Sequence, residues 1–135
     1  AVFHAGDSRV LRAAAGYVRP LTVDHTPLGA DLASGRLTEE EAREMPEASL
    51  LTRALGVTGD TRVEITAAHS WAPRTRLLLC TDGFHGAARG LPRAAIQEIL
   101  RRDEPVDTAL RTLIGAALAA DGTDNATLVL IDIST

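Results

Sequence analysis

The order of the apolar segments constrains the fold of this chain more than any other feature. Short stretches with strand-like alternation come first, two segments with helical spacing follow, and an apolar run at 126–133 closes the chain. Because strands and helices are segregated rather than strictly alternating, the pattern indicates an α+β fold. The length of 135 residues suits one domain, 1–135.

The N-terminal part is rich in strands and turns. Alternating apolar residues predict strands at 2–5, 10–13 and 17–21. The last two are separated by Ala15–Gly16, which is typical of a hairpin turn.

A polar insert of a different character runs from 24 to about 50. We expect a short helix at 31–34 that ends at Gly35, because glycine favours the left-handed cap. A second helix should begin after Thr38, since Glu41 lies three positions on and completes a capping box.

The second half predicts two strands and then two helices. The strands are expected at 62–66 and 77–80, and the helices at 92–101 and 105–120. The run 77–80 is continuously apolar, which predicts a strand covered on both faces.

Composition excludes several classes of function. The net charge is −4, which argues against nonspecific nucleic-acid binding. Every basic residue is Arg, so a Schiff-base or phosphate-binding lysine is excluded. No stretch approaches the roughly 20 apolar residues that a membrane-spanning helix needs. The lone Cys80 cannot form an internal disulfide, so we expect a reducing, cytoplasmic location.

Three aspartates share one setting, in which a Gly-containing turn adjoins an apolar strand. They are Asp7, Asp82 and Asp124. Strand ends are rigid mounts, and hard divalent cations prefer carboxylate oxygens. Each aspartate alone is also ordinary turn chemistry. Their combination favours a site for a hard divalent cation, in which the glycine near each aspartate lets another group approach closely.

Nearby polar residues allow two readings each. Arg9 could contact a phosphate or form a structural ion pair with the insert or with the Asp24 turn. We expect His25 to be a structural histidine and His85 to lie on the surface. The histidine spacings do not match a zinc motif.

Five short motifs in order make the chain similar to a known family. It resembles the C-terminal half of bacterial protein phosphatase 2C domains, the metal-dependent (PPM) serine/threonine phosphatases. The motifs are Gly6–Asp7–Ser8–Arg9, Asp24–His25–Thr26, Leu51–Thr52–Arg53–Ala54–Leu55–Gly56, Leu78–Leu79–Cys80–Thr81–Asp82–Gly83 and Gly122–Thr123–Asp124–Asn125.

The resemblance implies a function and a site. Asp82 and Asp124 would bind one ion of a binuclear Mn²⁺/Mg²⁺ centre, and Asp7 would help Asp82 to hold a third ion. Gly83, Asn125 and Arg9 would complete the binding motifs. The insert at 24–50 would be a flap beside a site where a metal-activated water hydrolyses phosphoproteins, including targets of a serine/threonine kinase.

The same resemblance implies that part of the family domain lies outside this sequence. The family's fold is a β-sandwich flanked by helices on both faces, and its first half carries the bridging aspartate and the phosphate-binding arginine. We therefore expect a fragment that is inactive alone and that associates with itself through exposed sheet. The alternative is a noncatalytic phosphatase-like domain that binds a protein partner.

Overall fold

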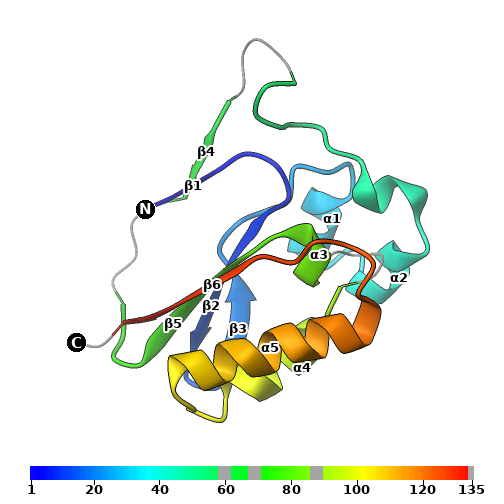
Figure 1. Ribbon diagram of the computed structural model, residues 1–135. Coiled ribbons are helices and arrows are strands. Elements are labelled where there is room, and N and C mark those ends of the chain that lie inside the picture. The colour runs from blue at the N-terminus through cyan, green and yellow to red at the C-terminus, as the bar shows by residue number, and fades with distance from the viewer. Residues whose placement is uncertain (58–61, 67–70, 86–89, 134–135) are drawn as a thin grey trace.

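The computed structural model describes residues 1–57, 62–66, 71–85 and 90–133, and it confirms the α+β class (Figure 1). All strand pairs are antiparallel. The strands are β1 (Val2–His4), β2 (Arg9–Ala14), β3 (Tyr17–Pro20), β4 (Glu64–Thr66), β5 (Thr75–Cys80) and β6 (Leu128–Ile133). The helices are α1 (Gly29–Ser34), α2 (Glu39–Arg43), the 3₁₀ turn η1 (Pro46–Ser49), α3 (Asp82–His85), α4 (Arg93–Leu100) and α5 (Val106–Asp121).

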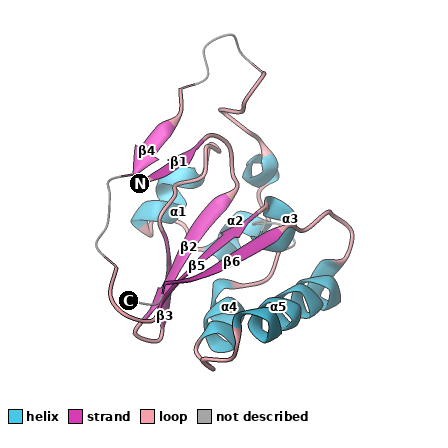
Figure 2. Cartoon of the chain, turned by 60° about the vertical axis from the view of Figure 1, so that its left-hand side comes forward, coloured by secondary structure: helices cyan, strands magenta, loops and turns pink. Residues whose placement is uncertain are grey.

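The larger sheet carries the core on one face. Its order is β3-β2-β5-β6, and α4 and α5 lie against one side of it (Figure 2). Leu11, Leu78 and Leu130 are paired across three strands, so their side chains form one buried row. Phe84 and Leu113 pack against this row and are fully buried. This aliphatic core fixes the position of the turns at the strand ends.

The opposite face of the larger sheet is apolar and partly open to solvent. Leu79 is 37% exposed, and Val129, directly opposite it on β6, is 50% exposed. Ile131, the next residue on this face of β6, is 43% exposed. The prediction that the strand at 77–80 is covered on both faces is therefore wrong. A continuously apolar run indicates that both faces of a strand are hydrophobic. In the described part of this chain, helices pack against one face of β5 (Figure 2).

The strand predictions in the N-terminal part are confirmed. The hairpin turns at Ala15–Gly16, where both residues have positive φ. β1 pairs with β4 in a separate two-stranded sheet, in which Phe3 lies opposite Ile65. Both strands were predicted, but their pairing was not, because it joins residues about 60 positions apart.

The helices of the insert begin and end as local signals require. Gly35 has φ +74 and accommodates the left-handed end of α1. The Thr38 hydroxyl accepts a hydrogen bond from the Glu41 amide, and the Glu41 carboxylate accepts one from the Thr38 amide. Both predictions are therefore confirmed. None of the helices in the described part of the chain combines the length and apolarity needed to cross a membrane.

Candidate metal-binding site

The end of β5 positions Asp82 at the start of α3. Thr81, the residue between them, ties this corner to the strand beside it. Its amide donates to the Thr127 carbonyl at 3.2 Å, and its hydroxyl accepts from the Thr127 amide at 3.0 Å. The sequence motif alone assigns no role to Thr81. Its two hydrogen bonds to Thr127 show that it holds Asp82 beside the segment leading into β6.

Gly83 allows the two aspartate-bearing turns to touch. A Cβ atom at Gly83 would overlap the carbonyl oxygen of Asn125 and would lie 3.3 Å from the Cβ of Asp124. No larger residue fits there without a backbone shift. This close approach places the turn that carries Asp82 beside the loop that carries Asp124.

The loop that carries Asp124 is shaped by its own carboxylates. The Asn125 amide donates to Oδ1 of Asp124 at 2.7 Å, and the Thr123 amide donates to Oδ1 of Asp121 at 3.2 Å. Asp124 is solvent-exposed, so a cation could reach it.

Asp7 lies within electrostatic reach of Asp82. Burial raises the pKa of the Asp7 carboxyl, and the negative charge of Asp82 raises this pKa further. Asp7 is half-buried in one turn and Asp82 is exposed at the start of α3, so a divalent cation between them would offset the repulsion of the two carboxylates. Their oxygen donors are of the kind that Mg²⁺ and Mn²⁺ accept.

Arg9 adopts the ion-pair alternative. Its Nε and Nη2 donate to the two oxygens of Asp24 at 2.8 and 2.6 Å, and its Nη1 lies 3.7 Å from Glu39. Burial alone would lower the pKa of Arg9, but the Asp24 carboxylate outweighs it and the pKa is raised. The guanidinium thus links the start of β2 to the base of the insert.

His25 is a structural histidine, as predicted. The Gly6 amide donates to its Nδ1 at 3.0 Å, so the proton of the neutral ring is on Nε2, which donates to Glu64 at 3.0 Å. Its ring stacks on that of His4, with centroids 4.5 Å apart.

Among the described residues, one group of three potential metal ligands has its ligand atoms within 4.8 Å of one another. It consists of His4, His25 and Glu64 and does not include the aspartates. His25 Nε2 carries a proton and His4 Nε2 donates to the Val23 carbonyl at 2.9 Å, so neither atom offers a lone pair. Arg53 adds a positive charge 3.3 Å from His25 Nε2. The cluster, as its hydrogen bonds stand, connects β1, β4 and the insert.

His85 is buried, so the expectation that it lies on the surface is wrong. It is 6% exposed, because the turn of α3 directs its ring inward with that of Phe84. Burial, with a smaller effect from the Arg9 charge, lowers the pKa of His85 to about 4. Neither ring nitrogen has a hydrogen-bond partner among the described residues. Spacing from Asp82 alone could not reveal which way the short helix turns.

The described chain combines an antiparallel sheet that carries helices on one face (Figure 2) with aspartates in the glycine-containing turns at its strand ends. Its sequence and fold are similar to those of bacterial PPM-type serine/threonine phosphatases, over about half the length of such a protein. One protein similar to this chain is the serine/threonine phosphatase stp of Listeria innocua. It is 31% identical over 131 residues, which are 97% of this chain and 50% of that protein.

Two solved structures have the same fold. The PPM phosphatase MsPP from Mycobacterium smegmatis, in complex with cacodylate, matches 98% of this chain and 55% of its own, with a TM-score of 0.82 and 34% identity. The catalytic domain of the serine/threonine phosphatase PstP, solved with two manganese ions, matches 98% of this chain and 53% of its own, with a TM-score of 0.76 and 30% identity. No family model matches the chain. The chain spans about half the length of these proteins.

Proposed function

We propose that this chain supplies part of the active site of a metal-dependent protein serine/threonine phosphatase. The observation that carries the proposal is the meeting of three aspartate-bearing turns at one end of the larger sheet. Asp82 raises the pKa of Asp7, and Gly83 brings the Asp82 turn against the Asp124 loop. The relatives named above are serine/threonine phosphatases, which supports the same reading.

We propose Asp82 and Asp124 as ligands of a Mn²⁺ or Mg²⁺ ion, with Asp7 serving a third ion beside Asp82. Such ions, when bound, activate water for attack on phosphorus and offset charge on the phosphoryl oxygens. Asp82 and Asp124 would fix the cation position, because Thr81 and the Gly83 contact hold their turns together. Asn125 would keep the Asp124 carboxylate oriented through its amide. The two manganese ions of the PstP structure support the choice of metal.

We propose the insert at 24–50 as a flap that borders the site. Its base is held by the Arg9–Asp24 pair and by His25, whose carbonyl accepts a hydrogen bond from the Thr52 amide at 2.8 Å. These contacts fix both ends of the insert while leaving α1 and α2 at the surface. Arg9 would then act by holding the flap, and a direct phosphate contact would require it to leave Asp24.

We propose phosphoproteins, including targets of a serine/threonine kinase, as the substrates, and the cytoplasm as the location. The net charge of −4 and the single cysteine are consistent with a signalling enzyme of that compartment, without nucleic acid or membrane as a partner. The separate reading of a noncatalytic partner-binding domain rests on the exposed face of Leu79, Val129 and Ile131. In the isolated chain we propose that this face drives self-association.

The test of the catalytic proposal uses the longer protein that contains this chain. Replacing Asp82→Asn should abolish Mn²⁺-dependent hydrolysis of a phosphoserine peptide, because it removes a ligand charge while keeping the shape. Asp107→Asn, the same change at an exposed position on α5, should leave the rate within about twofold. Full activity in Asp82→Asn would refute the assignment, and inactivity of the unsubstituted protein would favour the partner-binding domain.

A further inference from the structure

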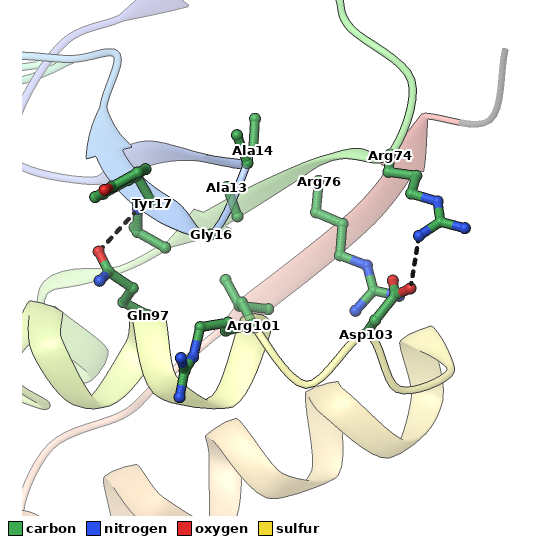
Figure 3. Close-up of a pocket in the computed structure, with 12 residues that line it drawn as sticks. Ala13, Ala14, Gly16, Tyr17, Arg74, Arg76, Gln97, Arg101 and Asp103 are labelled. Atoms are coloured by element: carbon green, nitrogen blue, oxygen red, sulfur yellow. Dashed lines mark hydrogen bonds and ion pairs between the residues drawn. The ribbon is translucent and has the colours of Figure 1, made fainter.

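A pocket lies at the end of the larger sheet that is remote from Asp7, Asp82 and Asp124. Its volume is about 240 Å³, and the β2–β3 hairpin, the start of β5 and the end of α4 form its walls (Figure 3). In the β2–β5 register, Ala13 and Arg76 mark this end of the sheet, whereas Arg9 and Cys80 mark the end near Asp82. The pocket is therefore separate from the proposed metal site.

Arg76 is an unusual residue for its position. It lies on the helix-covered face of β5 and is only 7% exposed. Its Nε pairs with Asp132 at 3.2 Å, and its Nη2 donates to the Glu104 carbonyl at 2.6 Å. Its Nη1 is buried and has no hydrogen-bond partner in the described part of the chain. A buried N–H donor of a charged group without an acceptor is rare and calls for one.

The other polar groups of the pocket also favour a negatively charged ligand. Three guanidinium groups, those of Arg74, Arg76 and Arg101, line it together with one carboxylate, Asp103, which lies 3.5 Å from Arg74 and 3.7 Å from Arg76. Arg101 also donates to Glu98 at 2.8 Å. Gln97 accepts a hydrogen bond from the Val18 amide through Oε1 at 3.1 Å, which leaves its amide nitrogen as a donor. The rest of the wall combines the small residues Ala13, Ala14, Ala15 and Gly16 with Tyr17, Val18 and Leu100.

Backbone strain is concentrated around the same pocket. The non-glycine residues with positive φ in the described chain are Ala15, Arg74 and Asp103, and all three line it. They come from three separate turns. A non-glycine residue with positive φ is uncommon, and such residues cluster at ligand sites.

We propose that this pocket binds the oxyanion of a small molecule, a carboxylate or a phosphate group. The oxyanion would accept a hydrogen bond from Nη1 of Arg76, while Gln97 and Arg101 line the other side of the pocket and Arg101 adds positive charge (Figure 3). Arginine is well suited to both groups because its N–H donors match the geometry of their oxygens. The inference stands independently of the proposed phosphatase activity.

The test is a titration of the metal-free protein at constant ionic strength, with phosphoserine in one arm and succinate in the other. Binding is followed by NMR on the Gln97 side-chain amide and the Arg76 Nε–H, which report on this pocket alone. We expect saturable shifts with at least one of the two anions. Saturation by phosphoserine only identifies a phosphate site, and saturation by succinate only identifies a carboxylate site.

Because Arg76 also anchors Glu104, the variants are placed elsewhere in the pocket. Arg101→Gln removes a charge from a residue whose side chain is 62% exposed, and Ala14→Leu fills the cavity. Each should weaken binding about tenfold, while Arg111→Gln, on the exposed side of α5, should change it less than twofold. Absence of saturable shifts with both anions, or binding unaltered in both pocket variants, overturns the proposal.

Discussion

Buried ionisable side chains near the aspartate turns respond to their surroundings in opposite ways. Burial raises the pKa of the Asp7 carboxyl and lowers that of the His85 imidazole, because burial disfavours the charged form of either group. Burial and the negative charge of Asp82 both favour the neutral form of the Asp7 carboxyl, and a bound cation would favour its charged form. His85 is neutral at physiological pH and packs as an uncharged ring.

His85 should make the protein acid-sensitive. The unfolded chain takes up a proton near pH 6.5, whereas the folded state resists it down to about pH 4. Stability that is present above pH 6.5 is therefore lost as the pH falls toward 4. His85→Leu should remove about 2 kcal/mol of the loss between pH 7 and pH 4.5, as measured by urea unfolding at both pH values. An unchanged difference between the two pH values would contradict a buried, neutral His85.

At the scale of secondary structure elements, the contact between α3 and the loop before β6 is decisive. Gly83 is the closest point between them, and Asn125 occupies the space where a Cβ atom would lie. The distance between the turns that carry Asp82 and Asp124 depends on this contact. Helix α3 therefore tolerates little change at Gly83, and its next two residues, Phe84 and His85, are buried.

Gly83→Ala should destabilise the protein by about 1–3 kcal/mol, because the Asn125 backbone must shift to admit a methyl group. Thermal unfolding of the metal-free protein measures the effect. Gly115→Ala is the matched control, since nothing lies near its added Cβ and alanine favours the interior of α5. The control should be neutral or stabilising by about 0.5–1 kcal/mol, and equal destabilisation in both variants would show that the Gly83 contact is unimportant.

Elements whose signals are local could be predicted from the sequence. The hairpin at Ala15–Gly16 and the capping box of Thr38 and Glu41 depend only on near neighbours. The three aspartates can be proposed as a set of metal ligands from their turns, but the approach of these turns through Gly83 and Thr81 depends on the sheet register. The inward turn of His85 and the open face of β5 depend on partners distant in sequence, so composition and periodicity could not reveal them.

At the scale of the whole molecule, one face of the larger sheet remains apolar and accessible. The relatives named above are about twice as long as this chain, and among the described residues helices cover one face of the larger sheet (Figure 2). Exposed apolar patches of this kind often mark surfaces that contact protein. We therefore propose that the sheet face around Leu79 governs association of the isolated chain.

The isolated chain should associate with itself through this face. Leu79→Ser combined with Val129→Ser should shift it toward the monomer, because the pair removes apolar area at the centre of the patch. Light scattering coupled to gel filtration gives the molar mass. Leu118→Ser, at a residue 58% exposed on α5, is the control and should leave the mass unchanged. A monomeric unsubstituted chain at high concentration would rule out self-association.

If Asp82 and Asp124 hold a divalent cation, as we propose, loss of either carboxylate must weaken Mn²⁺ binding. A calorimetric Mn²⁺ titration of the longer protein that contains this chain measures this, with Asp82→Asn, Asp124→Asn and the exposed control Asp107→Asn. We expect either site variant to weaken Mn²⁺ binding at least about tenfold, a cost near 1.4 kcal/mol, while the control binds normally. Undiminished Mn²⁺ affinity in both site variants would show that these aspartates are not ligands.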